Sequence, residues 1–469
     1  MNIPSASIKG RRAVVLGAGI AGLTAAGVLA RHFEQVTVIE WDRRGAEPSV
    51  RPHAPQGAHL HVLLAGGLLT LSRLIPELPG WLDDLGLHEG DLTHHVRMAY
   101  RGKWMPQIRS GIPIRPCTRP VVEHLLSRDV ARRNNITILD DCKAEGLLGR
   151  ERMHGVRVLR AGSMEEITAD LVVDAMGRAS PSARWQKDAG VPEAPEQIVD
   201  AGVVYSSCLL EPPGDLDDDW MALATSATRP HELRMGAVMR LGTGQILVSC
   251  IDYGKPKPPR TVEELIARTS ALSVPEIHRL LRASKPLSEI SVFTNTANRW
   301  RRYGALPWFP ERLIVLGDAV CNLNPRYGQG MTVAAFGADR LDTALSSYFE
   351  EHGRLDGFSH HFQKSLEEVL KVPWQMALLE DRLWVSVLSG AQPTLAERLL
   401  LKGSEQVLKA VFSDVETYSR FMRVGHLLEK PLSLLSLQTL ATIARGGHRG
   451  PSSGRPPGVG AMSGTASGL

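Results

Sequence analysis

Cysteine is scarce in this chain, which has five in 469 residues. Their number is odd and no two of them form a CxxC pair, so the sequence indicates neither a disulfide framework nor a zinc site. We therefore expect reduced thiols packed in the interior, and no bound metal. The five are Cys117, Cys142, Cys208, Cys250 and Cys321.

An excess of either charge is also missing. Lys and Arg number 54, Asp and Glu number 50, and aromatic residues make up only 5% of the chain. Nucleic-acid-binding surfaces usually combine basic runs with interleaved aromatics, so no nucleic-acid partner is expected. The chain has no apolar stretch of roughly eighteen residues or more, and its first residues lack the hydrophobic core of a secretory signal. The sequence thus predicts a cytoplasmic protein without a transmembrane segment.

Glycine is concentrated in one informative stretch, RRAVVLGAGIAGLTAAGVLARHFEQVTVIEWD, residues 11–42. The apolar run 13–16 predicts a buried parallel strand, and a GxGxxG turn follows it and opens a helix. The N–H groups and dipole of such a helix favour a pyrophosphate. A second strand over 36–39 precedes an acidic residue, about twenty residues after the motif, that can accept from ribose hydroxyls. The residues predicted to bind a dinucleotide here are Gly17, Gly19, Ile20, Ala21, Gly22 and Glu40.

Glu40 would repel a 2′-phosphate, so this site disfavours NADP and leaves NAD and FAD open. A second stretch, ERLIVLGDAVCNLNPRYGQGMTVAAFGADRL at 311–341, favours FAD. A buried strand there leads to Asp318, whose carboxylate could accept hydrogen bonds from ribityl hydroxyls, which nicotinamide cofactors lack. Gly328, Gly330 and Met331 then open a helix whose N–H groups could stabilise negative charge on a reduced isoalloxazine.

The length exceeds what a single core usually supports, so several domains are expected. Alternating apolar patterns predict an antiparallel sheet, and leucines at helical spacing near the C-terminus predict helices. The predicted fold is α/β: a Rossmann-like FAD-binding domain formed by residues 1–90, 115–200 and 305–350, an antiparallel-sheet substrate domain formed by 91–114 and 201–304, and a helical C-terminal region over 355–445. Residues 446–469 are rich in Gly, Ser and Pro and are expected to form a disordered tail.

Three motifs occur in the order found in FAD-dependent monooxygenases of the para-hydroxybenzoate hydroxylase type, which the chain resembles over most of its length. They are the GAGIAG turn with Glu40, DAMGRASPSARW at 174–185 and LGDAVCNLNPRYGQGM at 316–331. PQGAHLHVLLAGGLLTL at 55–71, CTRPVVEHLL at 117–126 and NRWRRYGALPWFPERLIVLGDAV at 298–320 are similar to the bacterial flavin epoxidases of polyether biosynthesis. The resemblance implies that Arg119 reaches the phosphate or ribityl region of FAD.

The resemblance implies an FAD-dependent monooxygenase that uses NADPH or NADH and O2 to insert one oxygen atom through a C4a-hydroperoxyflavin. The expected substrate is a small apolar molecule, free or carrier-bound: an alkene of a polyketide or terpenoid, epoxidised in secondary metabolism. The alternatives are an aromatic hydroxylase of the same family and an FAD-dependent reductase or dehydrogenase resembling geranylgeranyl reductase. The WxWxIP motif of flavin halogenases is absent, which disfavours halogenation.

No motif identifies a catalytic residue. His59 and His61 follow the second predicted strand at some distance and are the candidates for facing the flavin or relaying protons. A histidine in a polar loop more often has a solvated or packing role. Both residues are candidates for a catalytic role.

Overall fold

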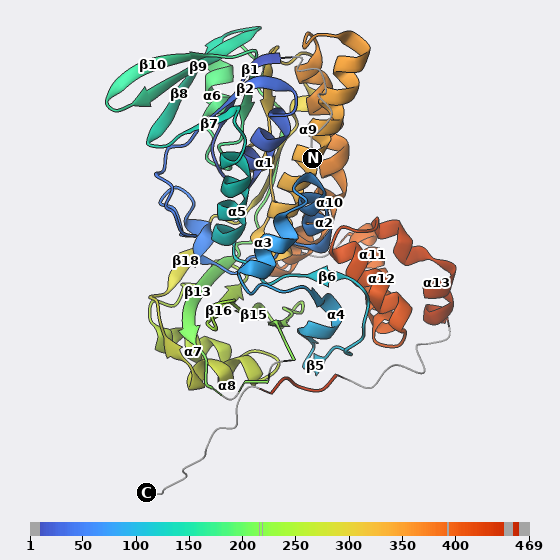
Figure 1. Ribbon diagram of the computed structural model, residues 1–469. Helices are drawn as coiled ribbons and strands as arrows, with labels where there is room; N and C mark the ends of the chain where they lie inside the picture. The colour runs from blue at the N-terminus through green and yellow to red at the C-terminus, as the bar shows by residue number, and fades with distance from the viewer. Residues whose placement is uncertain (1–9, 215, 218, 392–393, 445–453, 459–469) are drawn as a thin grey trace, which may run out of the picture.

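The computed structural model describes residues 10–214, 216–217, 219–391, 394–444 and 454–458, and its central element is a five-stranded parallel sheet (Figure 1). Every residue of one central strand, β11, is buried, as is typical of a parallel strand covered on both faces. Across the sheet the strands are β20 (Leu313–Val315), β11 (Leu171–Asp174), β1 (Gly10–Leu16), β2 (Phe33–Ile39) and β7 (Ile136–Leu139). Segments distant in the sequence thus meet in one sheet.

Helices from the two ends of the chain cover this sheet. The small-residue helix α1 packs on both α9 and α5, and α9 also packs on α2 and α10. Their bounds are α1 (Ile20–Leu29), α2 (Ala65–Leu74), α5 (Arg119–Ala131), α9 (Gly330–His352) and α10 (Phe358–Ser389). A three-stranded antiparallel sheet of β8 (Cys142–Gly149), β9 (Met153–Arg160) and β10 (Ser163–Thr168) follows β7 along the chain.

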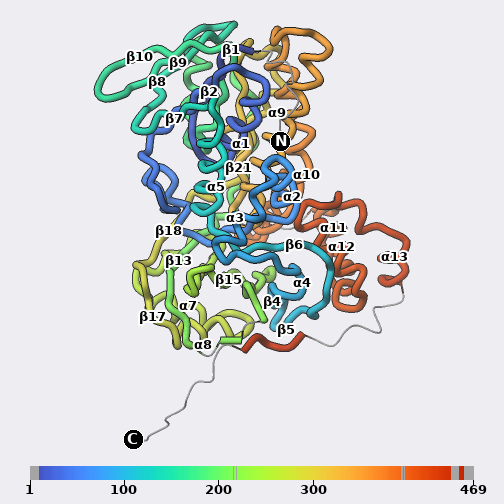
Figure 2. Tube along the Cα trace, viewed as in Figure 1, coloured from blue at the N-terminus to red at the C-terminus, as the bar shows by residue number. Residues whose placement is uncertain are grey.

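A second, larger sheet lies below the first in the view of Figure 1. Its order is β17 (Lys285–Pro286), β13 (Val204–Glu211), β16 (Ile246–Asp252), β15 (Arg234–Arg240), β14 (Ala222–Thr225), β4 (Val96–Tyr100) and β5 (Lys103–Trp104), and β18 (Ser291–Phe293) also pairs with β13. Most pairs are antiparallel, but β4 joins β14 in parallel. Figure 2 shows this early segment beside the green strands from the middle of the chain. Two strands of the 91–114 segment, β4 and β5, therefore form one edge of this sheet.

Helices α7 (Val262–Thr269) and α8 (Glu276–Ala283) pack against one face of the second sheet and share its apolar core. A small three-stranded sheet of β12 (Glu196–Val199), β19 (Asn298–Arg301) and β21 (Cys321–Asn322) lies where the chain passes between the two large sheets. Shorter elements are α3 (Leu78–Asp84), β3 (Gly90–Asp91), α4 (Leu92–His95), β6 (Pro113–Ile114) and α6 (Ser182–Asp188).

The C-terminal part of the described chain is helical, with α11 (Leu395–Val411), α12 (Val415–Gly425) and α13 (Leu437–Ala444) after α10. None of the helices in the described part of the chain has the length and apolar character that a membrane crossing requires. Most of the tail expected to be disordered, residues 446–453 and 459–469, lies outside the described residues. The piece 454–458 is described, and Gly454 N donates to the carbonyl oxygen of Trp104 at 3.0 Å.

Candidate functional site

A cavity of about 470 Å³ opens at the carboxyl ends of β1, β2 and β11 and extends to the second sheet at Phe293. Ligands of open parallel sheets bind at this end of the strands. Most of the residues predicted to bind a cofactor line it: Gly17, Gly19, Ile20, Ala21, Glu40, Arg119, Asp318, Gly328, Gly330 and Met331. The structure therefore brings the two sequence motifs, about three hundred residues apart, into one cavity of a size typical of ligand sites.

Two helix N-termini face this cavity without a side-chain cap. The N-cap residue of α1 is Gly19, which has no side chain, and that of α9 is Gln329, whose side chain accepts no hydrogen bond from the first turn. By contrast, Thr118, Thr261 and Asp414 cap α5, α7 and α12 with their side-chain oxygens. The first N–H groups of α1 and α9 are thus left for another acceptor, and both helix dipoles favour negative charge there.

The glycines of the two turns serve different purposes. A Cβ on Gly22 would lie 1.9 Å from the carbonyl oxygen of Gly17, so Gly22 allows α1 to approach the strand and does not itself line the cavity. Gly17 has a φ of +97°, which side chains disfavour. A Cβ on Gly330 would meet no atom within 4 Å. Because Gly330 has no side chain, space remains there that no other part of the fold fills.

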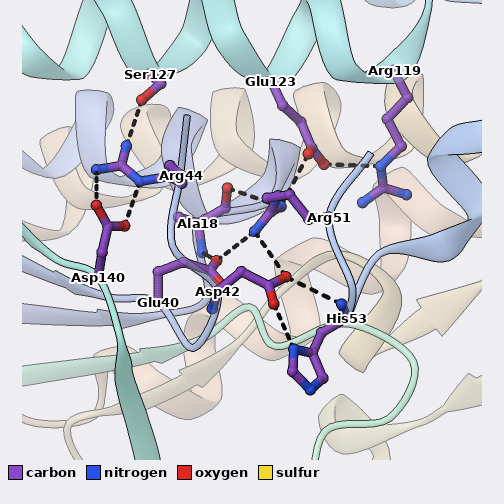
Figure 3. A network of polar contacts seen from close by, with 10 residues as sticks. All are labelled: Ala18, Glu40, Asp42, Arg44, Arg51, His53, Arg119, Glu123, Ser127 and Asp140. Atoms are coloured by element: carbon purple, nitrogen blue, oxygen red, sulfur yellow. Dashed lines mark hydrogen bonds and ion pairs between the residues drawn. The ribbon is translucent and has the colours of Figure 1, made fainter. Parts of the chain in front are cut away.

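Glu40, which lines the cavity, is at the centre of a polar network (Figure 3). Its Oε2 accepts from Ala18 N at 2.7 Å and from Arg51 Nη1 at 2.9 Å, and its Oε1 accepts from Asp42 N at 2.9 Å. Arg51 Nη2 also donates to Glu123 Oε2 at 3.0 Å. The carboxylate predicted to bind ribose is thus fixed in place, with acceptor capacity remaining on Oε1.

Arg51 and Glu123 were missed at the sequence level. Glu123 accepts from Arg119 Nε at 2.8 Å on the same helix face, and this i, i+4 pairing in CTRPVVEHLL was a signal that could have revealed it. Burial raises the pKa of Glu123, but Arg119 and Arg51 outweigh burial and hold it below its usual value. Arg51 lies in an irregular loop with no periodic pattern, so only the fold shows that it reaches Glu40.

Asp318, the predicted ribityl-binding residue, lies on the short 3-10 turn after β20. Burial raises its pKa, and Arg119 and Arg178 oppose that rise. Arg178 also lines the cavity, and it donates to the carbonyl oxygen of Ala297 at 2.9 Å and to the side-chain oxygen of Asn322. Two cationic side chains therefore lie near this carboxylate, and Arg178 was not predicted.

The two candidate histidines occupy different positions. His59 is 4% exposed and does not line the cavity. Its Nδ1 atom is 2.8 Å from Ser207 Oγ, and Ser207 Oγ is in turn 2.6 Å from Ser249 Oγ. His61 does line the cavity. Burial lowers the pKa of both residues to about 4, helped by His61 in the case of His59 and by Arg119 in the case of His61. His59 thus ties its loop to β13 and β16, and only His61 is placed to meet a ligand.

The chain has relatives of similar sequence among known proteins. No family model matches the sequence. Protein Rv3254 of Mycobacterium tuberculosis is 32% identical over 349 residues, 71% of this chain and 73% of that protein. The 6-methylpretetramide 4-monooxygenase of Streptomyces rimosus is 26% identical over 345 residues, 68% of this chain and 71% of the relative.

Two solved structures share the fold. PqsL, a probable FAD-dependent monooxygenase from Pseudomonas aeruginosa, has a TM-score of 0.59 at 18% identity, covering 81% of this chain and 96% of that one. The flavin-dependent brominase Bmp2 has a TM-score of 0.65 at 12% identity, covering 92% of this chain and 97% of that one. The predicted fold class, an α/β flavoprotein fold with an added sheet and a helical C-terminal region, is confirmed.

Proposed function

Because the chain belongs to the family of Mycobacterium tuberculosis protein Rv3254 and has the fold of FAD-dependent monooxygenases, we propose that it is an FAD-dependent monooxygenase using NADPH or NADH and O2. The observation that carries the proposal is the pairing of two uncapped helix N-termini with Glu40 and Asp318 in one cavity. One end suits a ribose and a pyrophosphate, and the other suits a polyhydroxyl chain and a ring that takes up negative charge.

The residues present fit FAD better than a nicotinamide dinucleotide. Gly19 and the N-terminus of α1 would hold the pyrophosphate, with Glu40 near the ribose. Asp318 would accept from the ribityl hydroxyls, and Arg119 would balance charge between the two halves. The open space at Gly330 leaves room for a flat ring against the start of α9.

Bound FAD would supply the redox chemistry, taking a hydride from the nicotinamide and activating O2 for transfer of one oxygen atom to the substrate. The chain itself would position the two partners and exclude water. Apolar side chains along the cavity, including Val62, Phe293 and Leu323, suit that task. The N–H groups of α9 would stabilise negative charge on the reduced ring.

We propose an alkene of a polyketide or terpenoid as the substrate, with epoxidation as the reaction. Phenol hydroxylation gains from a base that ionises the ring hydroxyl, whereas an alkene loses no proton before oxygen transfer. His61 has a pKa lowered to about 4 by burial and by Arg119, which makes it a poor base for a phenol of pKa about 10. Aromatic hydroxylation is the second candidate, favoured by the likeness to 6-methylpretetramide 4-monooxygenase.

The test begins with the purified protein and its visible absorption. We expect bound FAD and NADPH- or NADH-dependent O2 consumption. Styrene and phenol, each with ¹⁸O2, then separate the two reactions by mass: labelled styrene oxide supports epoxidation, and labelled catechol or hydroquinone supports hydroxylation. Alkene reduction without O2 uptake would instead identify a reductase, and a protein that takes up no FAD would overturn the cofactor assignment.

A further inference from the structure

His61 differs from the other histidines near the cavity in what its ring nitrogens contact. The His53 Nδ1 atom is 2.5 Å from Asp42 Oδ1, and the His59 Nδ1 atom is 2.8 Å from Ser207 Oγ. The Nδ1 atom of His61 is 2.8 Å from the carbonyl oxygen of His59. Among the described residues, Nε2 of His61 has no hydrogen-bond partner, and it is not closed off from the cavity that the residue lines.

The backbone contact fixes the tautomer of His61. A carbonyl oxygen has only lone pairs, so Nδ1 must carry the hydrogen and donate it. In the neutral ring the lone pair then lies on Nε2, on the side of the ring away from the backbone. His61 therefore presents the cavity with a hydrogen-bond acceptor, and not with a donor.

The surroundings keep the ring neutral. Burial and the positive charge of Arg119 both lower the pKa of His61, and they outweigh the contact with the His59 carbonyl and the nearby Glu123. At pH 7 the imidazole is uncharged, so a ligand meets an acceptor throughout the neutral range.

The position of His61 identifies which part of a ligand it meets. The next residue, Val62, packs against the Gly328 turn, 3.5 Å from where a Cβ on Gly328 would lie. Arg119 and Glu123, whose charges act on the pKa of His61, lie on α5. His61 thus belongs to the half of the cavity between Arg119 and the start of α9.

We propose that His61 Nε2 accepts a hydrogen bond from an O–H or N–H group in the flavin half of FAD, and so positions the ring against the second sheet. The inference rests on the proposed function, because it takes FAD as the ligand. Ribityl hydroxyls and ring N–H groups are the donors that this half offers. ADP, which shares the other half, has none of them.

The experiment measures dissociation constants of FAD and ADP for the FAD-free protein. His61→Leu removes the acceptor, and His61→Gln returns one near the position of Nε2. Loss of one buried hydrogen bond corresponds to about fivefold weaker binding. We expect that loss for FAD in His61→Leu, unchanged ADP binding, and FAD affinity close to wild type in His61→Gln. His124→Leu, on α5 outside the cavity, is the matched control.

A ¹⁵N-histidine spectrum gives a second readout that a packing role would not change. The Nε2 resonance of His61 should have the position of an unprotonated nitrogen and should move on addition of FAD but not of ADP. Equal FAD affinity in His61→Leu and wild type, equal losses for FAD and ADP, or a protonated Nε2 would overturn the inference. Wild-type protein that binds ADP but not FAD would overturn the proposed function as well, so the two failures are distinguishable.

Discussion

Replacing Asp381 tests how the wall of the cavity is held. Asp381 lies on α10, has no exposed surface, and is in contact with the turn before α9. Its Oδ2 accepts from Asn298 Nδ2 at 2.5 Å and from Asn324 Nδ2 at 2.9 Å, and its Oδ1 accepts from the hydroxyl of Tyr327 at 2.5 Å. Asn324 and Tyr327 flank Pro325, which lines the cavity. One carboxylate therefore joins α10, β19 and this turn.

The expected magnitude follows from the donors that each variant leaves behind. Asp381→Leu strands three buried donors, each costing about 1–3 kcal/mol when unpaired. Burial raises the pKa of Asp381, so removing this poorly solvated carboxylate offsets part of that loss. We expect a net loss of about 3–5 kcal/mol in the free energy of unfolding.

Asp381→Asn should cost much less. Both asparagine amides donate to the same oxygen, and an asparagine at 381 can keep that oxygen in place. Its new N–H group would face Tyr327, whose hydroxyl can accept as well as donate. We therefore expect a loss of about 1 kcal/mol, the net worth of a single hydrogen bond.

Urea denaturation followed by tryptophan fluorescence measures both variants, since Trp374 and Trp384 lie buried on the same helix. FAD affinity measured in parallel should fall in Asp381→Leu and stay close to wild type in Asp381→Asn. Equal unfolding midpoints for the two variants would refute the reasoning, because the expected difference in stability comes only from the donors that Asp381→Leu leaves unpaired. A stable Asp381→Leu protein would show that the turn needs no anchor on α10.

Three further outcomes are expected. Gly330→Leu should fold as wild type but bind FAD at least about tenfold more weakly, because the leucine side chain enters the open cavity. Gly403→Leu is the control, since a Cβ there also has no neighbours within 4 Å. Unchanged FAD affinity in Gly330→Leu would refute the prediction. Arg51→Met removes the arginine that pairs with Glu40, while Glu123 keeps only Arg119 as a cationic partner, at a cost of about 3–5 kcal/mol. Arg119 and Arg51 hold the pKa of Glu123 below its ordinary value against burial, so the stabilisation from this pairing is present above the ordinary pKa and is lost as the pH falls through the lower folded pKa. The difference between wild type and variant should therefore hold from about pH 7 to about pH 5 and shrink below about pH 4, and a constant difference down to about pH 3 would contradict this account. All five cysteines are buried, and burial raises the pKa of Cys117 and Cys250 to about 12. A colorimetric thiol reagent should therefore react with less than one thiol per native chain and with all five after denaturation.

The sequence predicts best what local pattern determines. The strand, glycine turn, helix and Glu40 of the first motif are consecutive in the chain, and each element follows from the neighbouring residues. The roles of Arg51 and Arg178 could not be predicted in the same way, because each lies in an irregular segment and acquires its partners only when distant strands pair. The difference between His59 and His61 has the same origin: it depends on Ser207 and Ser249, which come from the second sheet.

The C-terminal helices show why leucine periodicity alone gave an incomplete account of this region. Their contacts with the cavity walls include close polar ones. Asp381 of α10 holds the turn before α9, and His426, after α12, accepts from Ala65 N at 3.2 Å at the start of α2. The first turn of α2 directly follows the segment that carries His61. In this turn, a Cβ on Gly66 would lie 2.9 Å from the carbonyl oxygen of Leu427. Both walls that would enclose the flavin ring are thus fixed by residues from the end of the chain, so the shape of the cavity depends on the C-terminal helices being docked.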